Sequence, residues 1–128
     1  MRAAARPWRR RLSGLARTGG RRAEWIALAW LVLKGWRVLG FRLKTPQAEI
    51  DILALYGRVP AVLEVKSRAT LEAALEAVSP DQRERLRRAG RTLAARRPDL
   101  SGRTVSLDLM ALAPGRCPRH LVDAWLEA

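Results

Sequence analysis

The order of patterns along the chain predicts an α/β domain in which helices flank a mixed central sheet. Apolar residues recur at helical spacing over residues 21–34, three strand-like runs follow, and a capped helix and a further strand come later. A short turn joins the second and third runs into a hairpin, which excludes a doubly wound parallel sheet. The chain has 128 residues, of which 48% are hydrophobic, and this suffices for one domain with its own core.

The first helix is expected over residues 21–34. Ile26 and Trp30 lie one turn apart on the same face, and Gly35 stands where helices commonly end. Glu24 is the only acidic residue of this segment, and two interpretations are open for it. The pattern favours an acid that stabilises the positive N-terminal end of the helix dipole; the alternative is an acid that points over the helix end into an acidic cluster.

A first strand is expected over residues 36–43, and a hairpin follows it. Polar and apolar residues alternate in residues 49–53 and again in residues 63–66, as they do in strands with two different faces. Between these runs, Gly57 and Arg58 have the composition of a tight turn. The two runs are therefore expected to pair antiparallel.

The register of this hairpin brings two acidic side chains together. A two-residue turn pairs residues whose numbers sum to 115, so Asp51 lies opposite Glu64. Directly opposed side chains have Cβ atoms about 4.5–5.5 Å apart, and two carboxylates at that separation repel unless a cation or a shared proton neutralises them. Lys66 lies on the same face. The simplest chemical interpretation is a Mg²⁺ site with a positioned amine, and Mn²⁺ is a possible substitute.

A second interpretation of the same residues is a solvated hairpin face, which spacing alone favours. Against it stand Leu53 and Val62, which share the carboxylate face and suit a covered cleft better than open water. The opposite face is expected to carry Ile50, Ile52 and Ala54.

Capping signals predict two helices in the second half of the chain. Thr70 precedes a short helix over residues 71–78, and Ser79 followed by Pro80 marks the start of a longer helix that runs to about Arg97. The longer helix carries a basic stripe that is expected to face outward, where it contacts phosphates or is simply solvated. The stripe consists of Arg83, Arg87, Arg88 and Arg91.

The C-terminal part is expected to complete the sheet. Residues 104–111 alternate like a strand, and residues 119–125 add an edge strand or a short cap. Cys117 and His120 are the only cysteine and the only histidine, which excludes an intrachain disulfide and a thiolate zinc cage. Both residues are expected to be structural.

The charge of the chain points to a polyanionic partner. The net charge is +13, from 25 Lys and Arg against 12 Asp and Glu, which favours nucleic acid and, second, an anionic membrane surface. Residues 1–18 hold six Arg and no acid, as flexible interaction arms do. No apolar run is long enough to span a bilayer and none resembles a secretory signal, so a cytoplasmic location is expected.

Five short motifs also stand in a characteristic order. They are Gly20–Glu24, Gly35–Leu39, Glu49–Asp51, Glu64–Lys66 and Val78–Pro80. Together they resemble the YraN-like family, small bacterial proteins of uncharacterised function, over residues 19–125. That family in turn resembles the PD-(D/E)XK nucleases, archaeal-type Holliday-junction resolvases in particular. The resemblance implies a restriction-endonuclease-like αβββαβ core within a nuclease-like domain over residues 19–128.

The resemblance also implies roles for particular residues. Asp51, Glu64 and the backbone carbonyl of Val65 would hold Mg²⁺, and Lys66 would orient the attacking water. Glu24 would complete the acidic cluster, and Gln82 falls where such proteins place a Lys or Gln that reaches the site. The chain departs from the family in having Ala48 where Gly is usual, and Gln82 where many relatives have Lys.

The expected function is therefore Mg²⁺-dependent endonucleolytic hydrolysis of DNA, with branched or junction DNA as the substrate implied by the resemblance. The alternative is a nucleic-acid-binding module without turnover, for DNA or structured RNA. DNA is the expected partner ahead of RNA, no membrane partner is expected, and a homodimer is compatible with the resemblance.

Overall fold

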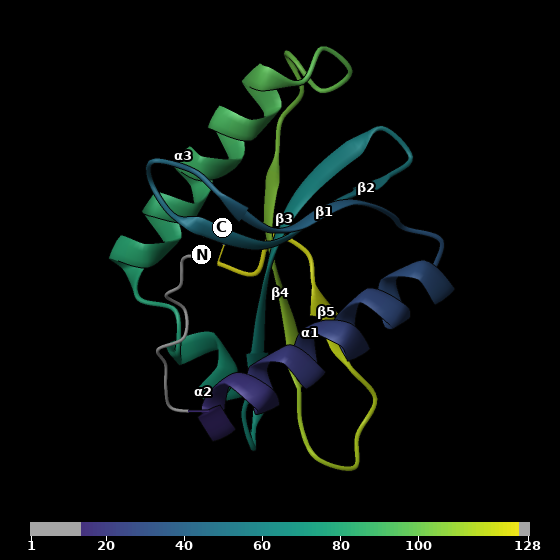
Figure 1. Cartoon of the computed structure of the whole chain (residues 1–128), viewed down its shortest axis with the longest axis vertical. Helices are drawn as coiled ribbons and strands as arrows, with labels where there is room; N and C mark the ends of the chain where they lie inside the picture. The colour runs from purple at the N-terminus through teal and green to yellow at the C-terminus, as the bar shows by residue number, and fades with distance from the viewer. Residues whose placement is uncertain (1–13, 126–128) are drawn as a thin grey trace.

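The computed structural model describes residues 14–125, which form an α/β domain (Figure 1). The expected αβββαβ order is confirmed, with one short helix and one short strand added, and it is consistent with a restriction-endonuclease-like core. The helices are α1 (Gly14–Leu33), α2 (Leu71–Glu76) and α3 (Pro80–Arg96); the strands are β1 (Arg37–Lys44), β2 (Glu49–Tyr56), β3 (Val59–Ser67), β4 (Ser106–Leu112) and β5 (Arg119–Leu121).

The five strands form one mixed sheet in the order β1-β2-β3-β4-β5. Strands β3 and β4 are parallel, and the other neighbours are antiparallel. Every residue of β4 is buried, because helices cover both faces of the sheet at this strand. The sequence expectation of a mixed sheet flanked by helices is confirmed.

Two hydrophobic clusters fix the helices on the two faces of the sheet. The first joins α1 to one face, and the second joins α3 to the other. The α1 cluster contains Ala23, Ala27, Leu31, Ile52, Ala54, Leu63 and Met110. The α3 cluster contains Leu53, Val62, Val78, Leu86, Ala89 and Leu107. Leu53 and Val62 are thus covered by a helix, as a cleft beneath the carboxylate face requires.

Ile50 does not share the face of Ile52 and Ala54, as the simple alternation predicted, but packs in the α3 cluster. The pairing of β2 with β3 runs from Tyr56 to Ile52, whereas the Glu49 end of β2 pairs with β1. Beyond Ile52 the β1–β2 ribbon therefore twists independently of β3 and turns toward α3. A hydrogen bond of 3.2 Å from Thr92 Oγ1 to Gln47 Oε1 joins α3 to the β1–β2 connection.

Helix α1 begins at Gly14, seven residues before the predicted start. Residues 14–18 of the predicted arm are therefore helical, and residues 1–13 lie outside the described part of the chain. Each glycine in a helix costs about 1 kcal/mol, but extending a helix that is already packed needs no new nucleation. The predicted glycine at the C-terminal end is confirmed: Gly35 has φ 90°, and the Trp36 N–H donates to the Leu31 carbonyl at 2.9 Å.

The two predicted caps are confirmed. Thr70 Oγ1 accepts a hydrogen bond from the Ala73 N–H at the start of α2, and Ser79 Oγ accepts one from the Gln82 N–H at the start of α3. Helix α3 then packs very close to the sheet. A Cβ atom added at Gly90 would lie 2.9 Å from Val62 Cγ2, so this contact depends on the absence of a side chain.

Among the helices that the structure describes, none combines the length and the apolarity that a membrane crossing needs.

Candidate metal-dependent site on strands β2 and β3

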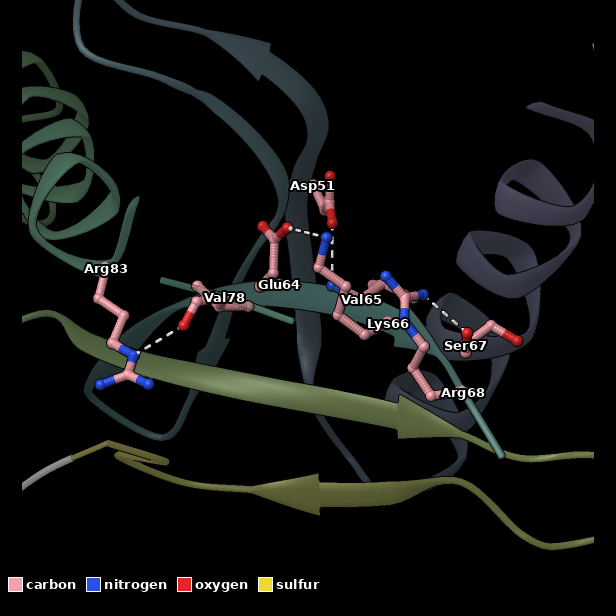
Figure 2. A network of polar contacts seen from close by, with 8 residues as sticks. All are labelled: Asp51, Glu64, Val65, Lys66, Ser67, Arg68, Val78 and Arg83. Atoms are coloured by element: carbon pink, nitrogen blue, oxygen red, sulfur yellow. Dashed lines mark hydrogen bonds and ion pairs between the residues drawn. The ribbon is translucent and has the colours of Figure 1, made fainter. Parts of the chain in front are cut away.

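The hairpin register predicted from the turn is confirmed. Ile52 pairs with Leu63 and Tyr56 pairs with Val59, so paired numbers sum to 115. Asp51 is the next residue after this pairing ends. Its Oδ2 accepts a hydrogen bond of 2.8 Å from the Val65 backbone N–H, which replaces a backbone partner at the point where β2 leaves β3 (Figure 2). The side chain of Asp51 is thus fixed against β3 by the backbone itself.

Glu64 is the second acid of the pair, and only 5% of its surface is exposed. Lys66 Nζ lies 3.4 Å from Glu64 Oε2, and Figure 2 shows the amine between the two carboxyl groups. The structure therefore brings together Asp51, Glu64 and Lys66, which the alternation of the two strands had placed on one face. A side chain as buried as Glu64 does not belong to a solvated hairpin face.

The electrostatics of the pair are those of a site that lacks positive charge. The pKa of Asp51 is raised from 3.8 to about 8, first because burial removes the carboxyl from water and then because Glu64 is close. The hydrogen bond from Val65 and the charge of Lys66 lower this pKa, but by less. Burial is also the largest cause that raises the pKa of Glu64 above 4.5.

These residues have the chemistry that a hard divalent cation needs. Two carboxylates are available on adjacent strands, and a metal ion would offset the repulsion that raises their pKa values. In a strand the N–H and C=O of one residue point to the same side, so the Val65 carbonyl faces the Asp51 side as its N–H does. Within residues 14–125, no group of three or more His, Cys, Asp or Glu side chains is arranged to hold a metal, so water would complete the coordination.

Glu24 lies in the middle of α1, not near its N-terminal end, so the dipole interpretation is wrong. It forms an ion pair with Arg42, whose Nε is 2.7 Å from Glu24 Oε1. The charge of Glu24 nevertheless contributes to the raised pKa values of Asp51 and Glu64, so it lies within electrostatic reach of both. Arg42 has φ 54°, an uncommon conformation for a residue with a side chain. Nothing in the sequence pattern identified Arg42 as the partner of Glu24.

Gln82 lies in the first turn of α3, half-buried, and its backbone N–H bonds to the cap Ser79. Within the described residues its side chain makes no hydrogen bond. The role of Gln82 at the acidic pair stays a prediction.

The basic stripe on α3 is less exposed than the sequence suggested. Arg83 is half-buried and donates to the Val78 carbonyl at 3.0 Å (Figure 2). Its guanidinium carbon also lies 5.2 Å from the Trp125 ring centroid. Arg87 is also half-buried. The expectation that these two residues stay outside is therefore wrong, because the carbonyl at the α2–α3 junction and the Trp125 ring draw Arg83 inward.

Arg88 and Arg91 remain exposed and share one acid. Their guanidinium nitrogens lie 3.4 Å and 3.9 Å from Glu84 Oε2. Exposed pairs of this kind contribute little stability, so both arginines can exchange Glu84 for a phosphate at small cost. Whether the stripe binds nucleic acid stays a prediction.

A second buried carboxyl, which the sequence did not reveal, lies on β4. Asp108 is fully buried, and its Oδ2 lies 2.7 Å from His120 Nε2. Its Oδ1 accepts hydrogen bonds from Ser106 Oγ at 2.9 Å and from the Asp123 N–H at 3.1 Å. The strand alternation placed Asp108 on a polar face, and only the β4–β5 pairing could have indicated His120 as its partner.

Comparisons with known proteins agree on one family. A model described as "Uncharacterised protein family UPF0102" matches residues 23–112, which include the acidic pair. A UPF0102 protein of Caulobacter vibrioides (strain NA1000 / CB15N) is 64% identical over 110 residues, covering 86% of this chain and 88% of that protein. A UPF0102 protein of Methylorubrum extorquens (strain PA1) is 43% identical over 125 residues, covering 98% and 96% of the two chains.

Proposed function

The chain belongs to the UPF0102 family, the YraN-like proteins that its motifs resemble, and we propose that it is a Mg²⁺-dependent endonuclease that hydrolyses phosphodiester bonds of DNA. The observation that carries the proposal is the pair Asp51 and Glu64, held together under cover with raised pKa values and one lysine between them. Strongly perturbed carboxyl groups of this kind cluster at functional sites.

In this proposal Asp51, Glu64 and the Val65 carbonyl hold the ion. When bound, Mg²⁺ supplies charge stabilisation at the phosphate and lowers the pKa of water. Lys66 orients the attacking water, since its amine already lies 3.4 Å from Glu64. The uncovered arginines Arg88 and Arg91 contact flanking phosphates, so binding weakens steeply as salt rises.

DNA is the proposed partner ahead of RNA, and junction or flapped DNA is the proposed substrate on the family resemblance alone. The same resemblance is compatible with a homodimer. The homodimer and the cytoplasmic location expected from the sequence both stay predictions.

The test is cleavage of a panel of duplex, flap, fork and four-way-junction DNA by wild type, Asp51→Ala and Lys66→Ala, with Mg²⁺ and with EDTA. We expect Mg²⁺-dependent products from wild type and a loss of at least about 100-fold in both variants, because each removes a group that acts in the transition state. Arg85→Ala, purified in parallel, is the matched control, since within residues 14–125 the only ion pair of Arg85 is with the exposed Asp81. Equal cleavage by all four proteins would show a contaminating nuclease and remove the assigned triad.

A non-catalytic nucleic-acid-binding module is the second candidate. It is favoured by the ion pair of Lys66 with Glu64 and by the raised pKa of Asp51, which together neutralise much of the pair without a metal. Calorimetric titration with Mn²⁺ separates the two candidates. Binding that disappears in Asp51→Ala, with release of a proton near pH 7, supports the metal site; no heat from wild type supports the binding module.

A further inference from the structure

A hollow of 450 Å³ lies away from the acidic pair, between the C-terminal end of α1, the β2–β3 turn and β5. Its lining includes three aromatic side chains, the only histidine and two cations: Trp30, Trp36, Tyr56, His120, Lys34 and Arg119. Its volume falls in the range of small-ligand sites. Tyr56 lies five residues from Asp51 on β2, which at about 3.4 Å per residue separates the hollow from the acidic pair by roughly 17 Å.

Three rings of the hollow lie in a tilted row, here called the aromatic shelf: the plane of the Trp36 ring makes an angle of 34° with that of Tyr56 and of 53° with that of His120. The Trp36 ring centroid lies 5.2 Å from that of Tyr56 and 5.0 Å from that of His120. Tyr56 is 53% exposed, so its ring is open to a ligand. Gly35 lies next to the Tyr56 ring, where a Cβ atom would be in ordinary van der Waals contact with Tyr56 Cε1 at 3.8 Å, and its φ of 90° favours glycine at this position. Such a shelf suits a flat, unsaturated ring.

The charges of the hollow select among flat ligands. Lys34 Nζ lies 4.8 Å from the Trp30 ring centroid, and Arg119 is exposed on β5. Neither forms an ion pair with an acid within the described residues. Two cations beside an aromatic shelf disfavour an organic cation and favour a ring that carries a phosphate.

His120 adds a directed polar group. Its Nε2 is held 2.7 Å from the fully buried Asp108, which fixes the ring, and within residues 14–125 its Nδ1 makes no hydrogen bond. The side chain of His120 lines the hollow and is only 13% exposed, so its ring is sheltered from water. A base edge stacked on the shelf would find a polar partner there.

We propose that this hollow binds an unpaired nucleotide, with the base stacked on Trp36 and Tyr56 and the phosphate between Lys34 and Arg119. The inference rests on the proposed nucleic-acid substrate and deepens it, because it assigns to the substrate a single-stranded part at a distance from the acidic pair. It does not rest on cleavage. A nucleotide of a strand and a free nucleotide share this chemistry, and the experiment distinguishes them.

The experiment measures binding of a fluorescein-labelled 12-nucleotide oligo(dT) strand by anisotropy, in EDTA and without Mg²⁺, so that cleavage plays no part. We expect Tyr56→Ala to weaken binding by about 5- to 100-fold, the range that loss of base–aromatic stacking gives. Tyr56→Phe, which keeps the ring, should bind within twofold of wild type. Lys34→Ala should weaken binding and reduce the salt dependence by roughly 0.7 in log–log slope.

The matched control is Phe41→Ala on β1, because Phe41 is an exposed aromatic residue outside the hollow, 42% exposed against 53% for Tyr56. A blunt 12-base-pair duplex should lose no affinity in Tyr56→Ala, since its bases are already stacked. Adenosine monophosphate and inorganic phosphate serve as competitors. Displacement of the bound strand by adenosine monophosphate, and not by the same concentration of inorganic phosphate, assigns the hollow to a free nucleotide, whereas strand binding that resists the nucleotide assigns the hollow to a strand.

The inference is overturned if Tyr56→Ala and Lys34→Ala both bind the single strand within twofold of wild type. It is also overturned if Phe41→Ala loses as much affinity as Tyr56→Ala, because the effect would then be general to exposed aromatic residues. Lys34 is exposed, so its variant keeps the test decisive even if Tyr56→Ala unfolds. The two proposals are tested separately. The binding assay tests the hollow, and the cleavage panel tests the acidic pair, so absent DNA cleavage alone would overturn only the endonuclease proposal.

Discussion

Two places in the sheet bury carboxyl groups, and they do so in opposite ways. Asp108 is fully buried and has three polar partners: the Ser106 hydroxyl and the Asp123 backbone N–H, which donate to it, and the His120 ring. Asp51 is half-buried and lies beside the buried Glu64, with one backbone N–H and one lysine for the four oxygens of the two carboxyl groups. The first arrangement is saturated and holds the C-terminal segment to the sheet. The second arrangement has fewer donors and positive charges than its four carboxyl oxygens can accept, as is common at functional sites.

The largest effect expected from this comparison is at Asp108. Asp108→Ala should lower the free energy of unfolding by about 3 kcal/mol, because it leaves His120, the Ser106 hydroxyl and the Asp123 N–H without their buried partner. Urea denaturation followed by circular dichroism measures it. A loss below about 1 kcal/mol would mean that the saturated carboxyl is not a structural element.

Asp51→Asn should have the opposite sign. The folded pKa of Asp51 is about 8 against 3.8 for the ordinary carboxyl, so between these values the folded protein keeps a proton that the unfolded chain releases. Wild-type stability therefore falls as pH rises through this window, and the uncharged amide escapes the loss. The full pKa difference corresponds to roughly 5 kcal/mol, but Asp51 is half-buried and partly screened by solvent, so we expect the variant to be more stable by about 2 kcal/mol at pH 8 and equal to wild type below about pH 4.

Denaturation curves of both proteins at pH 3.5, 5.5 and 8 check this prediction. Glu49→Gln is the control, since Glu49 is exposed on the same strand. If the variant is less stable than wild type at pH 8, the hydrogen bond to Val65 outweighs the burial of the carboxyl.

The smallest effect concerns the cation itself. At ten times its dissociation constant, Mg²⁺ or Mn²⁺ should stabilise wild type by about 1.4 kcal/mol, a rise of a few degrees in Tm. Asp51→Asn should show no such rise, because it removes one of two charged ligands. A scan of Tm against metal concentration at pH 7.5 measures both. The same rise in the two proteins would place the cation elsewhere on the molecule.

Local chemistry explains which parts of the fold could be predicted. The turn at Gly57, which has φ 60°, fixed the register of the hairpin, and that register placed Asp51 near Glu64. The caps Thr70 and Ser79 fixed the starts of two helices in the same way. Each of these features depends on residues close together in the chain, so the local sequence pattern is enough to predict it.

The missed features join residues far apart in the chain. Arg42 meets Glu24 only because α1 lies against β1, and Arg83 turns inward only because Trp125 packs beside it. His120 reaches Asp108 through the pairing of β4 with β5. None of these contacts follows from alternation or helical spacing, and for Glu24 the pattern favoured the interpretation as a helix-dipole acid over the one that places it near the acidic pair.

Gly90, which has no side chain, lets α3 pack closely against β3, the strand that carries Glu64 of the proposed site. Val62, the residue it touches, stands two positions before Glu64 on the same strand and the same face. Even a methyl group there would act as a wedge and lift α3 away from β3. Gln82 and Arg83 lie on that helix, so the distance between α3 and β3 determines how far their side chains are from the acidic pair. The absence of a Cβ atom at Gly90 sets that distance.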